Sequence, residues 1–428
     1  MNFIKNIIRT QLFRISSLNL LSILVRVAGG LLSSKMIALF IGPAGMTLTG
    51  NLRDFLSSVD IFSTLGLQNG IIKYTAENEN DVNKLRRIMA TVSLSIIAGI
   101  IICSLVLLLP AQYWSTRVFD GAVNYAWVFR ALAIALPLYT GNLVFVALLN
   151  GLGNYKEVIY LNIWGNVLGV LLSAIIIWQL GINGALIGLV IYPAILFFFS
   201  LYYVQRRFTS FDFLKFSNFD SSLLRGLFSY SVMSIITATL APFISISIRS
   251  MIIESSNINE AGYYTAINRI ASFYLMFAST LLTLYFLPKL SVAKTNKETQ
   301  NVFLSYYKSI VPLYAVSLVS IYVLRLVIIK LLFSTQFLPM SHLFAWQLTG
   351  DFFKICSLIL GYEFFAKKLT KAFIITEIFS FCVLYVSSSV LINKYGSEGA
   401  VMAHALTYFA YLVVLVTYFR KKITGHAV

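Results

Sequence analysis

The chain has 428 residues, of which 58% are hydrophobic and 11% are charged, and its mean hydropathy is +0.82. Soluble globular domains are about 45–50% apolar and about 25% charged, so this composition excludes that class and indicates a polytopic membrane protein. The long apolar runs do not alternate with polar residues, which favours membrane-spanning helices over the alternating strands of a barrel. A net charge of +17 raises nucleic-acid binding as an alternative.

Twelve apolar stretches have the length of about 20 residues that a membrane-spanning helix needs. The predicted spans are 16–40, 45–70, 88–110, 125–150, 157–179, 185–204, 226–252, 261–287, 305–324, 341–362, 372–392 and 399–419. Residues 1–15 predict a short amphipathic lead without a cleaved signal peptide. The longest connections, at 71–87, 111–124, 205–225, 288–304 and 325–340, are too short to fold as separate domains.

The basic residues are distributed unevenly between the two sides of the predicted membrane. With both termini in the cytoplasm, 22 of the 33 Lys and Arg residues lie on the cytoplasmic side and 5 on the opposite side. The positive-inside rule predicts this orientation. Most of the net charge is therefore a topology signal on short loops, and nucleic acid is not an expected partner.

Three short motifs of the first half recur in the second half, in the same order and at offsets of 217, 209 and 215 residues. They predict duplication of a six-helix unit, with lobes at 1–204 and 226–428 and a cytoplasmic linker at 205–225. Parallel repeats of this kind are related by an axis along the membrane normal, and we expect a central cavity between the lobes. The matched pairs are Ala44-Gly45 and Asn51 with Ala261-Gly262 and Asn268, Thr140-Gly141-Asn142 with Thr349-Gly350-Asp351, and Gly181-x-x-Gly184-Ala185 with Gly396-x-x-Gly399-Ala400.

Charges within the predicted spans are the main candidates for function, because each costs about 2.5–3.5 kcal/mol at the centre of a spanning helix. The first, second, seventh and eighth spans hold four arginines against two aspartates. Guanidinium groups match phosphate oxygens in a bidentate geometry. We therefore expect an anionic cargo, most simply a phosphate or diphosphate, bound in the cavity by Arg26, Arg53, Arg249 and Arg269.

Structural alternatives exist for each of these charges. Arg53 and Asp60 are seven residues apart and share a helix face, so Arg53 could form a buried strut with Asp60 or with Asp54. Arg249, Arg269 and Arg130 could extend towards the membrane interface. Asp351 and Lys354 are three residues apart in the tenth span and are expected to form a local ion pair or a switchable pair. Asp54, Asp60, Asp351, Lys354 and Arg130 are thus candidate charge partners or switch residues.

The chain has no recognisable enzyme constellation, and neither a metal nor a cofactor is expected. There is no Gly-rich nucleotide loop of the GxxxxGK[ST] form. The cysteines lie inside apolar runs and are interpreted as core residues. The histidines are far apart in sequence, with no carboxylate or cysteine at ligand spacing. These residues are Cys103, Cys356, Cys382, His342, His404 and His426.

Several stretches of the chain resemble the Wzx-type flippases of O-antigen and enterobacterial common antigen repeat units, in the multidrug/oligosaccharidyl-lipid/polysaccharide exporter superfamily. The tenth span, LFAWQLTGDFFK from Leu343 to Lys354, is the most specific match. The resemblance runs from the first span to the basic tail at 420–422. Its other parts are Phe40-x-Gly42-Pro43-Ala44-Gly45, Asn51-x-Arg53, Asn69-Gly70-x2-Lys73-Tyr74, Leu85-Arg86-Arg87 and Gly361-Tyr362.

This resemblance implies two six-helix lobes around a V-shaped cavity. It implies flipping of an undecaprenyl-diphosphate-linked oligosaccharide repeat unit between the leaflets of the bacterial inner membrane, for O-antigen or related surface polysaccharide. Relatives that flip the peptidoglycan precursor use cavity arginines on helices of the same order as those of Arg26, Arg53 and Arg269. Polymerase and chain-length proteins of the pathway are candidate partners.

Two other functions remain open at this point. A cation-coupled multidrug exporter of the same superfamily would need an acid-rich cavity. A membrane glycosyltransferase or polymerase would use acids of the outer loops, of which there are few. The driving force is also open, between the membrane potential acting on an anionic headgroup and a countercurrent of protons or another ion through an aspartate.

Overall fold

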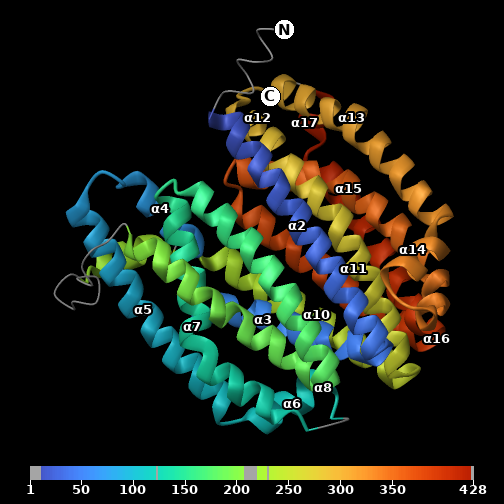
Figure 1. Ribbon diagram of the computed structural model, residues 1–428. Coiled ribbons are helices and arrows are strands. Elements are labelled where there is room, and N and C mark those ends of the chain that lie inside the picture. The colour runs from blue at the N-terminus through green and yellow to red at the C-terminus, as the bar shows by residue number, and fades with distance from the viewer. Residues whose placement is uncertain (1–10, 122–123, 207–218, 229–230, 426–428) are drawn as a thin grey trace, which may run out of the picture. The chain divides into compact units, whose positions relative to one another are not determined.

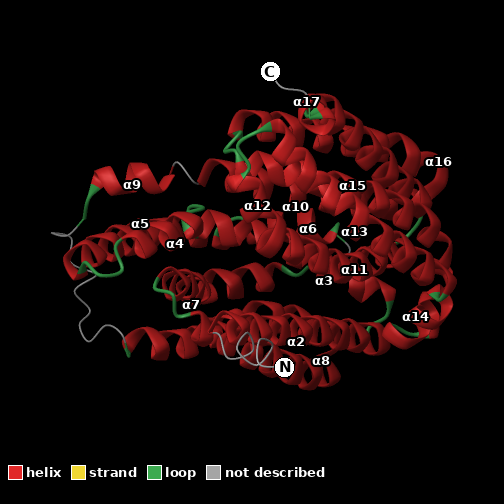
Figure 2. Ribbon diagram, turned by 90° about the horizontal axis from the view of Figure 1, so that it is seen from above, coloured by secondary structure: helices red, strands yellow, loops and turns green. Residues whose placement is uncertain are grey.

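The computed structural model of the chain describes residues 11–121, 124–206, 219–228 and 231–425 (Figure 1). In these ranges the chain is helical and has no strand, as Figure 2 shows, which confirms the all-α prediction. The predicted amphipathic lead lies mostly outside the described residues. Most of the predicted linker at 205–225 lies outside them as well.

Contacts divide the chain into two compact units. Unit 1 contains residues Met1–Phe40 and Leu48–Pro242, and unit 2 contains Ile41–Thr47 and Phe243–Val428. The division therefore falls within two helices, Pro43–Ser63 and Ser231–Ser255, and a short segment near the start of the chain packs with unit 2. The lobe limits inferred from the sequence repeat remain a prediction.

In the described part of the chain, unit 1 contains seven whole helices, α3 from Leu48 onward and the beginning of α10. α8 runs beside both α7 and α2 (Figure 1). A buried core of apolar side chains joins α4, α5, α7 and α8, and Leu227 of α9 fills a place in it. The helices are α2 (Gln11–Phe40), α3 (Pro43–Ser63), α4 (Gln68–Glu77), α5 (Val82–Leu108), α6 (Ala111–Phe119), α7 (Ala126–Gly151), α8 (Tyr155–Gln205) and α9 (Ser221–Phe228).

Unit 2 is built around α15, which packs along α16 and also contacts α11, α12 and α13. Its elements are α10 (Ser231–Ser255), α11 (Ile258–Leu281), the π-helix η3 (Leu282–Phe286), α12 (Leu287–Val292), α13 (Asn296–Val323), α14 (Arg325–Leu332), the 3-10 helix η4 (Thr335–Leu343), α15 (Phe344–Ala366), α16 (Thr370–Tyr418) and α17 (Arg420–Thr424). The beginning of α10 belongs to unit 1, because the division falls at Pro242.

The described helices are consistent with the predicted twelve membrane crossings. Nine helical segments among them are long and apolar enough to cross a membrane. Two of these, α8 and α16, are interrupted by a glycine with non-helical dihedral angles, and each is long enough for two crossings. The remaining predicted span corresponds to α3, which carries the charges Arg53, Asp54 and Asp60.

The two interrupting glycines adopt the same backbone conformation. Gly181 has φ 56° and ψ −128°, and Gly396 has φ 56° and ψ −135°. Three residues later the chain packs against the preceding helix so closely that only glycine fits. A Cβ on Gly184 would lie 2.1 Å from the carbonyl oxygen of Ile176, and one on Gly399 would lie 2.2 Å from that of Leu391. The third repeated motif therefore encodes the same helical hairpin in each half.

The first repeated motif brings its two copies together within unit 2. A Cβ on Gly262 of α11 would lie 2.1 Å from the carbonyl oxygen of Pro43 at the start of α3. Beside it, the Thr47 hydroxyl donates to the carbonyl oxygen of Ile258 at 2.8 Å. The small residues of this motif therefore permit a close helix crossing.

Helices occupy much of the connections between the predicted spans. α4, α6 and α14 occupy three of them, and α13 begins nine residues before its predicted span. Short helices satisfy backbone groups locally at the membrane surface, where few protein partners are available. Asp81 caps one such boundary by accepting the backbone N–H of Lys84 at 3.0 Å.

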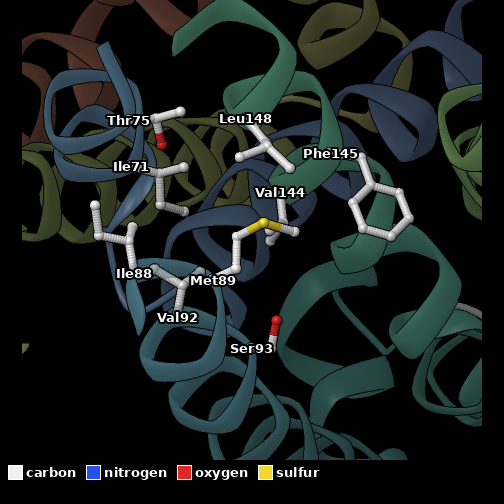
Figure 3. Close-up of a pocket in the computed structure, with 9 residues that line it drawn as sticks. All are labelled: Ile71, Thr75, Ile88, Met89, Val92, Ser93, Val144, Phe145 and Leu148. Atoms are coloured by element: carbon white, nitrogen blue, oxygen red, sulfur yellow. The ribbon is translucent and has the colours of Figure 1, made fainter. Parts of the chain in front are cut away.

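A small apolar cavity lies among α4, α5 and α7 (Figure 3). Its volume is about 20 Å³, and Ile71, Met89, Val92 and Leu148 are among the residues that line it. This space is close to that of one water molecule, and its lining is largely apolar. The cavity is therefore a packing defect and too small to hold a sugar or a lipid headgroup.

Candidate functional site

A cluster of polar side chains is buried in the middle of unit 2, around Asp351 of α15. The Asp351 side chain has no exposed surface. Its Oδ2 accepts hydrogen bonds from the Gln347 Nε2 at 3.0 Å and from the hydroxyl of Tyr274 on α11. Gln347 and Asp351 are four residues apart on one helix and so present both groups on the same face.

His404 of α16 completes this cluster. Its Nε2 lies 3.0 Å from Asp351 Oδ1 and 3.4 Å from Gln347 Nε2, and the imidazole is 11% exposed. The sequence spacing of the histidines gave no sign of this carboxylate partner. The two residues are 53 positions apart in the sequence, and only the packing of α16 against α15 joins them.

Gly350 makes this close packing possible. A Cβ at that position would lie 2.4 Å from His404 Cδ2 and 2.9 Å from the Cα of Ala405. Any larger residue would push α16 away from α15. The second copy of this repeated motif, Thr349-Gly350-Asp351, thus combines the carboxylate with the small residue that lets its histidine partner approach.

Lys354 lies one turn further along α15, next to a second polar group. Its Nζ lies 4.8 Å from the centroid of the Tyr408 ring, and this ring also packs against the His404 imidazole, with centroids 4.8 Å apart. Glu377 on the first half of α16 accepts the Tyr411 hydroxyl at 3.1 Å and interacts electrostatically with Lys354. The close ion-pair contact of Asp351 is with His404, at 3.0 Å, and Lys354 interacts with the Asp351 carboxylate electrostatically.

Two of the predicted arginines lie on helices of unit 2. Arg249 of α10 is buried, with 5% of its surface exposed. Arg269 of α11 is half-buried, and its guanidinium lies 5.2 Å from the centroid of the Phe273 ring. Tyr274 is the next residue after Phe273. The helix α11 therefore carries both Arg269, a predicted substrate contact, and a hydrogen-bond donor to Asp351.

The other predicted charges lie in unit 1. Arg53, Asp54 and Asp60 of α3 are half-buried, whereas Arg26 of α2 and Arg130 of α7 are exposed. Arg26 is near enough to the Tyr192 hydroxyl of α8 to interact with it electrostatically.

Asp60 has an aromatic partner in the same unit. The hydroxyl of Tyr139 on α7 hydrogen-bonds the Asp60 carboxyl group. A carboxylate–tyrosine bond therefore joins the second and fourth spans of the first half, and another joins the corresponding spans of the second half. The residue types are exchanged between the two, because α11 supplies Tyr274 and α15 supplies Asp351.

The structure thus gathers one compact set of functional groups that the sequence pattern did not join: Asp351, His404, Gln347 and Tyr274. The signal available in the sequence was a histidine inside an apolar span, which is as costly to bury as the arginines. Within the described ranges, no group of three or more His, Cys, Asp or Glu side chains could hold a metal ion. The cluster itself combines a carboxylate, an imidazole, an amide and a hydroxyl within hydrogen-bonding reach.

The chain is similar to known proteins along almost all of its length. Residues 15–293 match the family model described as polysaccharide biosynthesis protein. A lipid III flippase of Escherichia coli strain K12 is 30% identical over 392 residues, covering 91% of this chain and 94% of that protein. A lipid III flippase of Shigella flexneri matches with the same values.

Solved transporter structures share the fold at lower identity. An inward-facing multidrug resistance MATE family transporter of the MOP superfamily aligns with a TM-score of 0.79 and 14% identity, over 94% of both chains. The lipid II flippase MurJ, in an inward closed conformation, aligns with a TM-score of 0.68 and 14% identity, over 96% of this chain and 90% of the other. The chain therefore belongs to the polysaccharide biosynthesis protein family, in its Wzx-type branch.

Proposed function

We propose that this protein flips an undecaprenyl-diphosphate-linked oligosaccharide repeat unit from the cytoplasmic to the periplasmic leaflet of the bacterial inner membrane. The movement occurs by alternating access, and it serves the synthesis of O-antigen or a related surface polysaccharide. Both termini lie in the cytoplasm, and the protein acts as a transporter without an enzymatic step. Polymerase and chain-length proteins of the same pathway are its candidate partners.

The observation that carries the proposal is the 30% identity to a lipid III flippase over 94% of that relative's length. It covers 91% of this chain and therefore extends into both halves. A multidrug exporter remains the alternative. The solved exporters share only the fold with this chain, and its spans carry more arginine than aspartate in the helices predicted to bind cargo.

In this mechanism the diphosphate is bound by Arg26 and Arg53 of unit 1, with Arg249 and Arg269 of unit 2 as further contacts. Guanidinium groups on apolar helices are costly unless an anion or another partner offsets them. Charge-assisted hydrogen bonds to phosphate oxygens provide that compensation, and the polyprenyl chain stays in the lipid. Asp54 and Asp60 would hold the cationic groups between transport cycles.

The test is flipping of fluorescently labelled lipid-linked oligosaccharide by protein reconstituted in liposomes. Loss of a hydrogen bond to a charged group costs about 1.5–3 kcal/mol, so Arg26→Ala and Arg53→Ala are each expected to slow flipping about 10- to 100-fold. Arg325→Ala is the matched control, because Arg325 is half-buried on α14, is not among the predicted cargo contacts, and donates to the Tyr322 carbonyl oxygen at 2.8 Å. Unchanged rates in both well-folded cavity variants would refute the assigned roles.

A genetic experiment tests the substrate class. The chain is expressed in a strain that lacks its own repeat-unit flippase, and the surface glycan is analysed. Restoration of a lipid-linked glycan supports the proposal and identifies the sugars. Drug resistance without any glycan phenotype would favour the exporter alternative.

A further inference from the structure

We propose that the Asp351–His404 pair, closed by Gln347 and Tyr274, is a proton-binding site that couples inward proton movement to outward flipping of the lipid. This inference rests on the proposed flippase function and specifies the ion that drives it. The ligand is a proton, delivered from water. The argument starts from the hydrogen bonds of the cluster.

The Asp351 carboxylate is fully supplied with donors. It is completely buried and is contacted by three side chains, of which Gln347 and His404 each lie at 3.0 Å and Tyr274 provides a hydroxyl. Three donors favour the ionised carboxylate over the neutral acid. An imidazole is the side chain that gains a proton in the physiological range, so His404 is the group that takes up the proton beside this fixed negative charge.

Gln347 provides an independent indication that the cluster is incomplete without a further donor. Its residue is 1% exposed, and its Oε1 is buried with no hydrogen-bond partner among the described residues. An unsatisfied buried acceptor costs about 1–3 kcal/mol, so its presence next to two proton carriers requires an explanation. A protonated His404 imidazole, or a hydronium ion that delivers the proton to His404, would supply the hydrogen-bond donor that the Gln347 Oε1 lacks.

The charges around the pair limit it to one proton. Lys354 on α15 lies beside the Tyr408 ring, which also contacts His404, and this lysine interacts electrostatically with Asp351. Its positive charge opposes a second proton in the cluster. Glu377 on the first half of α16 interacts with Lys354 and partly offsets it. On α11 and α13, Tyr274 and Tyr314 face the cluster as neutral hydroxyls, and Tyr314 donates to the Tyr274 carbonyl oxygen at 3.0 Å.

Tyr274 connects the cluster to the cargo-binding helix. The same helix, α11, carries Arg269, five residues before Tyr274. A proton on His404 competes for the Asp351 charge and weakens its hold on the Tyr274 hydroxyl. The position of α11, and with it that of Arg269, therefore depends on protonation of the pair. By linkage, cargo binding through α11 must in turn change the proton affinity of the pair.

The far end of α11 contains a place where the helix can adjust. The π-helix at Leu282–Phe286 interrupts the regular hydrogen bonding, and such segments are common at functional sites. Tyr362 of α15 spans this region, with its hydroxyl 3.0 Å from the Thr283 hydroxyl and 3.2 Å from the Ser279 carbonyl oxygen. The contact at Ser279 joins α11, and the contact at Thr283 joins η3, to the helix that holds Asp351, so movement of one helix affects the other.

The experiment measures flipping and proton flux together in liposomes loaded with a pH-sensitive dye. If one proton is exchanged for each lipid, a gradient of about one pH unit shifts the steady-state distribution between leaflets about tenfold. We expect His404→Gln to retain flipping driven by the membrane potential and to lose both the shift and the lipid-dependent proton flux. Asp351→Asn and Tyr274→Phe are expected to reduce the shift. His342→Gln and Tyr307→Phe are the matched controls and should behave as wild type.

The outcomes separate this inference from the proposed function. Wild-type flipping without any response to the pH gradient, or an unaltered response in His404→Gln, overturns the proton site and leaves the flippase function standing. A response to a sodium gradient in place of the pH gradient also overturns it, in favour of a metal-ion site. If wild-type protein flips no lipid, the proposed function fails, and an isotope-labelled histidine titration by NMR still tests proton uptake at His404. Failure of His404→Gln to remove a titrating signal then refutes the site.

Discussion

The close approach of α15 and α16 at Gly350 gives a quantitative prediction. In Gly350→Ala, the new Cβ would lie 2.4 Å from His404 Cδ2 and 2.9 Å from the backbone of Ala405, so α16 must move. Overpacking of this kind typically costs about 1–3 kcal/mol. Replacing glycine by alanine within a helix contributes about 0.5–1 kcal/mol in the opposite direction. The expected net effect is therefore a destabilisation of up to about 2.5 kcal/mol.

Gly361 of the same helix provides the control. A Cβ at that position would meet only the Tyr411 hydroxyl, at 3.9 Å, which is an ordinary contact. Gly361→Ala is therefore expected to be neutral or stabilising. The helix-propensity contribution is common to both variants, so the difference between them measures the steric cost of about 1–3 kcal/mol.

The assay is thermal unfolding of the purified variants in one detergent, followed by loss of the monodisperse peak on size-exclusion chromatography. Gly350→Ala should melt below wild type, and Gly361→Ala at or above it. In the liposome assay, Gly350→Ala should also weaken the response to a pH gradient, because His404 is displaced from Asp351. Equal melting temperatures for the two variants would refute the argument that Gly350 sets the spacing of the helices.

Three further perturbations test other parts of the structure. Gly181→Ala and Gly396→Ala place a side chain at φ 56°, and each should cost about 1–3 kcal/mol; a stabilised variant in a melting experiment would contradict this. The Glu363 carboxylate has no exposed surface and accepts the Lys422 ammonium at 2.5 Å. Lys422→Met removes this ion-pair partner and leaves a buried, unpaired charge. This change should cost about 3–5 kcal/mol, and the double variant with Glu363→Gln should recover most of the loss. The backbone N–H of Lys84, in the first turn of α5, donates to Asp81 and lowers the pKa of this carboxyl group below its ordinary value of 3.8. The cap therefore contributes its full stability to the fold above pH 3.8. This contribution is lost as the pH falls through the lower pKa of the folded state. Asp81→Asn keeps the acceptor, and its melting temperature should lose this acid dependence; an unchanged pH profile would argue against the cap.

The internal repeat was predicted with useful accuracy where it depends on local backbone geometry. The matched glycines at 181 and 396 have nearly identical dihedral angles, and those at 184 and 399 meet the same kind of backbone neighbour. Glycine is required there because any side chain would be strained or would collide, so the residue type itself carries the structural information.

The candidate site was predicted less completely. Asp351 and Lys354 were correctly placed on one helix. The direct partner of Asp351 is His404, which lies on another helix, and the residues around His404 in the sequence do not indicate this contact. Tyr274 and Tyr139 were not distinguished from the many other span tyrosines. Each role depends on one hydroxyl that contacts a carboxylate on a neighbouring helix. The helical periodicity of the sequence does not indicate such a contact.

The sequence by itself determined the membrane class, the helical fold and the family, because hydropathy, the placement of Lys and Arg and the repeated glycines are properties of local chain segments. Only the tertiary structure decided which buried polar groups meet. A carboxylate in an apolar span must find donors, and which donors it finds depends on how closely neighbouring helices approach. That distance is set at Gly350, where the absence of a side chain brings His404 onto Asp351.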